Sequence, residues 1–475
     1  MGAEQQVVYG VPEAAVQPPA VAADASAPKS LGADHVRMGG SESVLARSDQ
    51  GFFSGAGFWS MADQGVVSAG NFFTTILLAR CLLPAEYGVY ALLFGLILMM
   101  NGFHSAFIWY GMSLLGASRS EAELRPLAGG SLVLTAALAV VLGIALGSTA
   151  VYFHRAPLAS WLLLALLFWQ IQETTRRALM CRLRFRDALW GDALSYLGQT
   201  ACIAVLFFVH RLTIASAFGV MSATSAAAAL LQAAQLKLTP PDFRGAFRLL
   251  PEFWDTGRWA LLVSVAQAFI GQALLWFLAL AGTAEVASFQ SVLNLLRATN
   301  PVMFGIGSVL LPTVAAQAGK PAAGLYAARR YGLLGALVLL PYFALLFVFP
   351  GLTLRLFYGV GSPYVGLGLV LRLLVVGSAF AYVTYILGSY YYGLSKSYIV
   401  FRSQLVAVAF TVVAGLVLVM KAGVLGAAVA YVLTFTAQTG VLVWFLRQRV
   451  VSVAVEPRSI EKGERLEDKG ELVGK

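Results

Sequence analysis

The sequence has few charged residues, which make up 12% of its 475 positions, while hydrophobic residues make up 59%. A soluble domain usually carries about 25% charged and about 45–50% apolar residues. So few polar side chains cannot cover the surface of a soluble protein of this length. Together with the mean hydropathy of +0.76, this predicts a chain embedded in lipid.

Cysteine and histidine are also scarce. The three cysteines are far apart and odd in number, which excludes a disulfide framework and argues against a zinc cluster. The four histidines form no HxxxH or HExxH pair, and we find no Walker A loop, catalytic dyad or nucleophile elbow. We therefore expect no metal, no cofactor, no built-in ATPase and no enzyme activity. The cysteines are Cys81, Cys181 and Cys202.

The net charge of +10 is distributed in short gaps between apolar runs rather than on one continuous stretch. If both termini are cytoplasmic, 18 Lys and Arg residues flank the apolar runs on the inner side and five on the outer side. Cytoplasmic loops of membrane proteins carry such an excess. The pattern predicts a multi-pass protein of the bacterial inner (plasma) membrane with both termini cytoplasmic, and it argues against nucleic-acid binding.

Apolar segments close to the roughly 20 residues that a helix needs to cross a bilayer recur twelve times. They are too long and too uniform for barrel strands. We therefore predict an all-α integral membrane fold with about 12 transmembrane helices. The expected spans are 56–79, 87–112, 128–152, 158–179, 189–209, 214–236, 259–281, 286–312, 331–354, 367–392, 400–420 and 424–446.

The longest inner connection divides these spans into two six-helix lobes. A short internal repeat supports the division: Ala-Glu in an outer turn, followed four residues after the Glu by an aromatic residue, occurs at Glu86 and again 199 residues later at Glu285. Many transporters hold substrate between two such related halves. The predicted organisation is a disordered cytoplasmic tail (1–50), an N-lobe (51–236), a cytoplasmic linker (237–257), a C-lobe (258–449) and a charged cytoplasmic tail (450–475).

Residues 77–92, which read LLARCLLPAEYGVYAL, resemble a signature of the polysaccharide transporter (Wzx-type) flippases. In that family the first helix ends in Arg-Leu-Leu-Gly-Pro-Glu-Glu-Phe-Gly, and the next begins with Leu-Tyr. Residues 282–289 with 309–312, and residues 356–359 with 363–364, are similar to two further patterns of the family. The Pro-Ala-Glu of this chain departs from the commoner Gly-Pro-Glu. The family belongs to the multidrug/oligosaccharidyl-lipid/polysaccharide exporter superfamily.

The resemblance implies a flippase that moves a polyprenyl-diphosphate-linked oligosaccharide from the cytoplasmic to the periplasmic leaflet by alternating access. The product would supply exopolysaccharide, O-antigen or capsule assembly. The implied partners are an undecaprenyl-diphosphate-linked oligosaccharide and membrane lipid, and contacts with a polymerase and glycosyltransferases of the same pathway are compatible with this role.

Three alternatives remain. The first is a cation-coupled multidrug exporter of the same superfamily, which would need an apolar cavity with one essential acid. A membrane enzyme, such as an oligosaccharide polymerase or acyltransferase, would need a large outer loop or clustered catalytic residues, and we find neither. Lipid II flippases usually have fourteen spans, against the twelve predicted for this chain.

Polar side chains inside spans are candidate substrate contacts, because they are costly in lipid. In the eighth span Gln290, Asn294, Arg297 and Asn300 recur at spacings of four, three and three, which places them on one helix face. Arg297 could bind a diphosphate bidentately, and the amides could bind sugar hydroxyls. Pro301 follows and permits a kink. The alternative is an arginine that only pairs with an acid of the other lobe.

Four further residues have two interpretations each. Arg80 and Arg372 could extend a cationic wall, or their side chains could reach the outer headgroups. Asp63 could be a proton or sodium site or the counter-charge of Arg297, or it could cap the first helix. His104 could take up a proton during transport or could be hydrogen-bonded packing.

Other charges are expected to be structural. Glu173 lies three and four residues before Arg176 and Arg177, a spacing that favours an intrahelical pair near the inner surface. We expect Asp192 to be a helix-start charge. The basic run from Arg176 to Arg186 is expected to attract anionic lipid on the cytoplasmic side.

Overall fold

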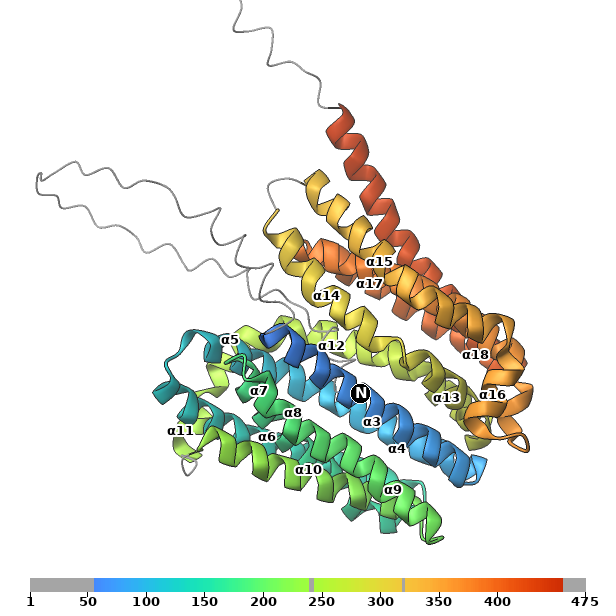
Figure 1. The fold of residues 1–475 in the computed structure, drawn as a ribbon, viewed down its shortest axis with the longest axis horizontal. Helices are drawn as coiled ribbons and strands as arrows, with labels where there is room; N and C mark the ends of the chain where they lie inside the picture. The colour runs from blue at the N-terminus through green and yellow to red at the C-terminus, as the bar shows by residue number, and fades with distance from the viewer. Residues whose placement is uncertain (1–54, 239–242, 318–320, 456–475) are drawn as a thin grey trace, which may run out of the picture.

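The computed structural model describes residues 55–238, 243–317 and 321–455. All regular elements within these residues are helices, and they form one elongated bundle (Figure 1). The predicted tail 1–50 lies outside the described residues, as does the predicted C-terminal tail from residue 456 onward. An all-α fold is therefore confirmed for the described part of the chain.

The helices of the N-lobe follow the first six predicted spans closely. A π-helical turn (Ser105–Trp109) joins α4 to α5, and a second (Ala193–Leu197) joins α8 to α9, so each pair forms one span. The helices are α3 (Ala56–Cys81), α4 (Pro84–His104), α5 (Tyr110–Ser118), α6 (Glu121–Tyr152), α7 (Ala159–Met180), α8 (Phe185–Asp192), α9 (Gly198–Phe208) and α10 (Ile214–Leu236).

The second half of the chain is also built of membrane-length helices, and the helix direction changes at two notable points. Between α13 and α14 the helix axis bends by 49°, next to Pro301. In α18 the backbone of Gly423 has a positive φ of 54° with ψ −129°, a conformation open to glycine, and it divides the helix into two spans. The helices are α11 (Phe243–Arg248), α12 (Leu250–Ala279), α13 (Thr283–Arg297), α14 (Asn300–Ala315), α15 (Pro321–Val348), α16 (Pro350–Tyr358), α17 (Gly368–Gly393) and α18 (Ser397–Val455).

The number of spans agrees with the sequence. Among the described residues, eight helices are long and apolar enough to cross a membrane, or nine if the bent pair α13–α14 counts as one span. Neither α3 nor α7 belongs to this group, although both exceed 20 residues, and α18 contains two spans. If α3, α7 and both halves of α18 each cross the membrane as well, the number reaches the predicted twelve.

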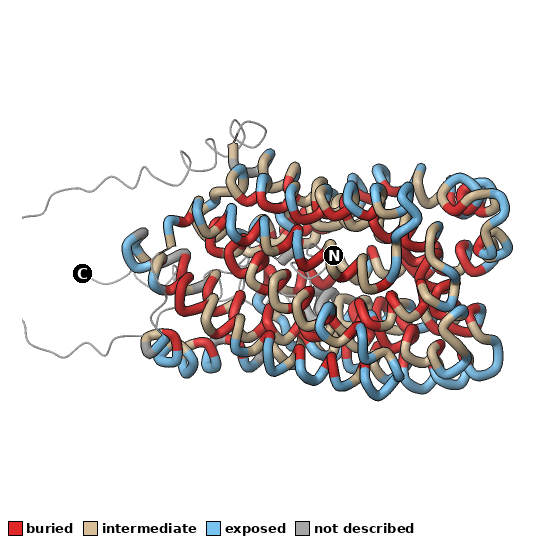
Figure 2. Tube along the Cα trace, turned by 90° about the horizontal axis from the view of Figure 1, so that it is seen from below, coloured by how far each residue is buried: buried red, intermediate tan, exposed pale blue. Residues whose placement is uncertain are grey.

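The surface of the bundle is apolar, as a lipid environment requires. Large hydrophobic side chains on α15 are well exposed, including Leu333 at 71% and Leu337 at 67%. Figure 2 shows the buried positions along the inside of the bundle and the exposed ones around its outside. With the apolar helices, this arrangement is that of a multi-pass membrane protein.

The helices form two groups, and α12 packs against both of them. Figure 1 places α3 to α10 on one side and α13 to α18 on the other, with α12 between them. The hydrophobic core of the N-lobe around Trp109 and Leu179 also contains Ala246 of α11 and Phe253 of α12. The first turns of α12 and part of the predicted linker 237–257 therefore pack against the N-lobe, while the 237/258 boundaries remain a prediction.

Candidate functional site

The predicted polar face of the eighth span meets the other lobe. The Nε2 atom of Gln290 donates to Oδ1 of Asn294 over 2.8 Å, and Nδ2 of Asn294 donates to the hydroxyl of Tyr87 on α4 over 2.7 Å. Asn294 and Tyr87 are each 1% exposed. The polar side chains of α13 are thus directed at the boundary between the lobes, where Tyr87 of the first turn of α4 reaches Asn294 in the last turn of α13. The start of α4 lies at the end where α13 also begins. In the predicted topology this is the outer end.

Arg297 lines a pocket formed by both lobes. The pocket is narrow and partly open to solvent. Arg297 is the charged side chain among its lining residues, and amides and hydroxyls supply the other polar groups. A guanidinium with amides beside it can bind phosphate oxygens and neighbouring hydroxyls. The lining is Thr75 of α3, Tyr87, Tyr90, Ala91, Phe94, Gly95 and Leu98 of α4, Gln272 of α12, and Gln290 and Arg297 of α13.

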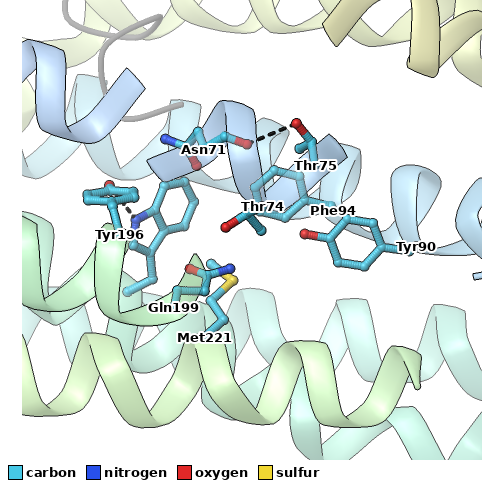
Figure 3. A pocket seen from close by; sticks show the side chains of 9 residues that line it. Asn71, Thr74, Thr75, Tyr90, Phe94, Tyr196, Gln199 and Met221 are labelled. Atoms are coloured by element: carbon cyan, nitrogen blue, oxygen red, sulfur yellow. Dashed lines mark hydrogen bonds between the residues drawn. The ribbon is translucent and has the colours of Figure 1, made fainter. Parts of the chain in front are cut away.

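A second pocket continues from the first into the N-lobe (Figure 3). The two share Thr75, Tyr90 and Phe94, and the rings of Tyr90 and Phe94 are stacked with centroids 5.7 Å apart. The second pocket adds the amides of Asn71 and Gln199. A mostly apolar, uncharged surface with several polar groups therefore extends from the pocket of Arg297 towards the interior of the N-lobe.

Three predicted site residues lie away from these pockets. Asn300 begins α14, beyond the 49° bend, so the helix face expected from regular spacing ends at Arg297. Arg80 is exposed at the end of α3. Arg372 is exposed on α17, where its Nε donates to the carbonyl of Phe347 over 2.9 Å. Roles of Arg80, Arg372 and Asn300 in substrate binding remain predictions.

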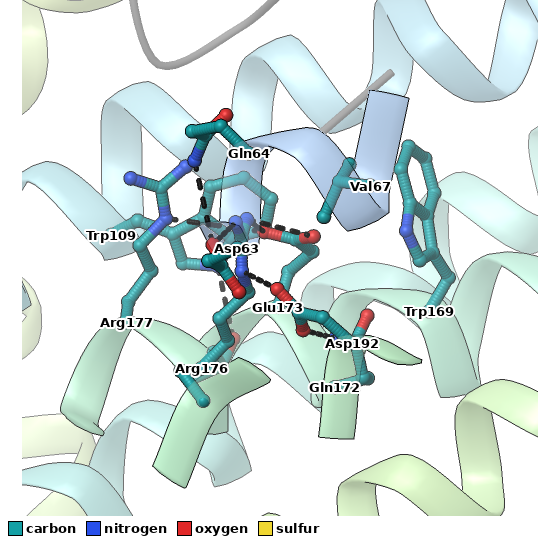
Figure 4. Close-up of polar contacts among 12 residues, drawn as sticks. Asp63, Gln64, Val67, Trp109, Trp169, Gln172, Glu173, Arg176, Arg177 and Asp192 are labelled. Carbon is teal, nitrogen blue, oxygen red and sulfur yellow. Dashed lines mark hydrogen bonds and ion pairs between the residues drawn. The ribbon is translucent and has the colours of Figure 1, made fainter. Parts of the chain in front are cut away.

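The most buried charges of the described residues form a cluster inside the N-lobe (Figure 4). Arg176 of α7 contacts Asp63 of α3 with Nη2 and Oδ2 2.6 Å apart, and Glu173 with Nη1 and Oε2 3.2 Å apart. Its Nε contacts the carboxylate of Asp192. All four side chains are 0% exposed. One guanidinium therefore joins three helices through three carboxylates.

This cluster corrects several expectations from the sequence. The intrahelical pair of Glu173 and Arg176 exists, and both side chains are buried inside the N-lobe. Asp192 ends α8 and binds Arg176 instead of marking a helix start. In this structure the counter-charge of Asp63 is Arg176, not Arg297. The spacing rule for helices detects partners three or four residues apart, whereas Asp63 and Arg176 are 113 residues apart.

Neutral groups add hydrogen bonds to the cluster. Tyr196 donates to Oε1 of Glu173 over 2.9 Å, and Trp169 donates to the Tyr196 hydroxyl over 3.1 Å. Gln172 and Gln232 both donate to Oδ1 of Asp192, over 2.8 Å and 3.3 Å. Buried ions need such additional hydrogen bonds to offset the cost of removing them from water. The network spans α3, α7, α8, α10 and the π-helical turn after α8, so it holds the N-lobe together.

His104 is fully buried on α4. Its Nδ1 lies 3.4 Å from the carbonyl oxygen of Met100, and its Nε2 lies 3.2 Å from that of Thr135 on α6. The side chain therefore bridges α4 and α6, as the packing interpretation expects. Proton uptake by His104 stays a prediction.

No protein-family model matches the sequence, and no curated protein matches it. Solved structures do share its fold. An inward-facing multidrug resistance MATE family transporter of the MOP superfamily aligns with a TM-score of 0.69 at 15% identity, over 83% of this chain and 99% of that one. An outward-facing conformation of such a transporter gives 0.59 at 15% identity, over 83% and 94%.

A third structure with this fold is a MOP superfamily transporter from Pyrococcus furiosus, described as having a binding pocket of reverse polarity. Its TM-score is 0.60 at 15% identity, over 84% of this chain and 95% of that one. The chain is thus a multi-pass helical membrane protein. Its two-lobed fold is that of the MATE transporters of the MOP superfamily.

Proposed function

We propose that this protein is a transporter of the bacterial inner membrane that flips a polyprenyl-diphosphate-linked oligosaccharide to the periplasmic leaflet. The observation that carries the proposal is Arg297, the charged lining residue of the pocket between the lobes. A diphosphate is strongly anionic and presents oxygens in a geometry that a guanidinium can bind with two parallel hydrogen bonds. The amides of Gln272 and Gln290 lie in the same pocket, where they can bind the sugar next to the diphosphate.

The arrangement of the lobes supports an inward-facing starting state. Contacts between α4 and α13 close the predicted outer end, and the fold is more similar to the inward-facing than to the outward-facing relative. Arg297 would capture the diphosphate from the cytoplasmic side, the lobes would rock, and the substrate would leave outward. The isoprenoid tail would stay in lipid throughout, since each of its buried CH₂ groups favours an apolar environment by about 0.8 kcal/mol.

A cation-coupled multidrug exporter is the second candidate, because proteins with this fold include multidrug resistance transporters. Such an exporter would use an acid to bind a cationic drug or a coupling ion. In this chain the buried carboxylates of Asp63, Glu173 and Asp192 already contact Arg176, and the pocket between the lobes carries a cation. These observations favour an anionic substrate.

A binding experiment separates the two candidates. We expect undecaprenyl diphosphate to raise the melting temperature of the purified full chain in nanodiscs, since a ligand at 100 times its Kd stabilises by about 2.7 kcal/mol. The lipophilic cation tetraphenylphosphonium should have no effect. Melting is followed by tryptophan fluorescence. Stabilisation by the cation alone would favour the multidrug exporter and reject the flippase.

A further inference from the structure

We infer that the contact between Tyr87 and Asn294 closes the predicted outer end of the passage between the lobes, and we call it the outer gate. In the closed state the Tyr87 hydroxyl accepts the hydrogen bond from Asn294 that a substrate hydroxyl would accept in the open state. Opening of the outer gate and binding of a sugar at Asn294 would then be linked, because both require Tyr87 to leave. The identity of the sugar rests on the proposed function. The gate itself does not.

The Tyr87–Asn294 hydrogen bond crosses the boundary between the lobes. Tyr87 belongs to the N-lobe, where its ring stacks on Tyr90 with centroids 6.3 Å apart. Asn294 belongs to α13, which is fixed within the C-lobe by Tyr358 and Tyr342. Their hydroxyls donate to the carbonyls of Ser291 over 2.6 Å and Leu295 over 2.8 Å. Separation of the lobes at this end must therefore break the bond between Tyr87 and Asn294.

Backbone packing beside this bond is equally close. A Cβ atom at Gly88 would overlap the carbonyl oxygen of Thr283, so the first turns of α4 and α13 approach at a distance that only glycine permits. Tyr87, Asn294 and Gln290 are 1%, 1% and 5% exposed. These side chains therefore have little contact with water while the gate is closed. The closed gate therefore depends on the Tyr87 hydroxyl.

The gate borders the pocket that contains Arg297. Tyr87 and Gln290 line this pocket, and Gln290 donates to the same Asn294 amide whose Nδ2 binds Tyr87. A sugar hydroxyl and a phenolic hydroxyl can both accept from an amide N–H. A glycan whose diphosphate is bound by Arg297 can thus take over Asn294 when Tyr87 moves away. A ligand that binds only the open arrangement shifts the equilibrium towards it.

The gate is tested by labelling a cysteine behind it. Ala91, one turn further along α4, lines the same pocket and is 6% exposed. The full chain would carry Ala91→Cys, with its three native cysteines replaced by alanine. It is treated in spheroplasts with a membrane-impermeant maleimide, which reaches Ala91→Cys from outside only when the gate opens. We expect Tyr87→Phe to increase the labelling rate about 5- to 150-fold, the effect of losing one buried hydrogen bond.

Two further variants control for general loosening. Tyr342→Phe also removes a hydroxyl bound to α13, but its bond lies within the C-lobe, so it should leave the labelling rate unchanged. Asn294→Leu removes the other partner of the gate and should act like Tyr87→Phe. Only variants that elute as monodisperse protein are compared. An unchanged rate in both Tyr87→Phe and Asn294→Leu, or an equal increase in Tyr342→Phe, overturns the inference.

A second arm tests the link to substrate. Lipid-linked oligosaccharide from an export-deficient strain is added to the Ala91→Cys protein in proteoliposomes, and we expect it to increase the labelling rate. In Asn294→Leu, which is labelled fast without lipid, the lipid should cause no further increase. Faster labelling in Tyr87→Phe, without any effect of the lipid on the parent protein, would still support the role of Tyr87 as the gate. It would contradict the link to glycan binding and count against the proposed substrate.

Discussion

Replacing Arg297 by glutamine is expected to reduce export of surface polysaccharide at least about 100-fold while the protein still inserts in the membrane. The substitution removes the cation of the pocket between the lobes and keeps a polar side chain of similar length. Hydrogen bonds to charged groups contribute about 1.5–3 kcal/mol each. Losing two of them therefore weakens binding of the diphosphate by at least about 100-fold. Secreted polymer, normalised to the amount of membrane-inserted protein, measures the effect.

Two variants sharpen this test. Arg402→Gln also removes an arginine from a predicted span, but Arg402 is exposed and lies over the ring of Tyr398 at the start of α18, so export should stay near the parental level. Arg297→Lys keeps the positive charge but loses the planar guanidinium that can form two parallel hydrogen bonds. Its export should lie between that of Arg297→Gln and that of the parent. Parental export by Arg297→Gln would remove the basis for assigning the diphosphate to this pocket.

Replacing Arg176 by methionine is expected to destabilise the N-lobe by about 3–5 kcal/mol, the usual cost of removing one partner of a buried ion pair. The change leaves the carboxylates of Asp63, Glu173 and Asp192 in the interior without the guanidinium that contacts all three. Thermal unfolding of the purified protein in detergent, followed by tryptophan fluorescence, measures the loss.

The control for this variant is the adjacent arginine. Arg177 is 16% exposed, lies 3.9 Å from Glu173 and stacks over Trp109, so Arg177→Met should have a much smaller effect. Neutralising the carboxylates as well, with Asp63→Asn, Glu173→Gln and Asp192→Asn, should restore part of the stability lost in Arg176→Met. Equal unfolding temperatures for Arg176→Met and Arg177→Met would show that the cluster does not hold the lobe together.

Local patterns in the sequence predicted what depends on local structure. Apolar length located the helices to within a few residues at most ends, and the spacing of Gln290, Asn294 and Arg297 placed them on one face of α13. The kink at Pro301 was also expected, but not its consequence, because the bend moves Asn300 off that face. Regular spacing holds only while the helix is straight.

The buried cluster could not be predicted because its contacts are tertiary. Asp63, Arg176 and Asp192 come from different helices, and no spacing rule connects them. The signal that was available is the presence of Asp63 and Asp192 inside predicted spans, where a charge needs a partner. Which partner each finds depends on how α3, α7 and α8 pack. The same holds for Tyr87, whose role depends on its contact with α13 of the other lobe.

The most direct test of the flippase proposal uses a strain that lacks this protein. Its polyprenyl-diphosphate oligosaccharides are extracted and quantified by mass spectrometry, and their accessibility is probed in sealed spheroplasts. We expect loss of secreted polymer and accumulation of a complete, unpolymerised repeat unit that is protected inside the spheroplasts. Normal polymer with unchanged lipid intermediates would contradict the proposal.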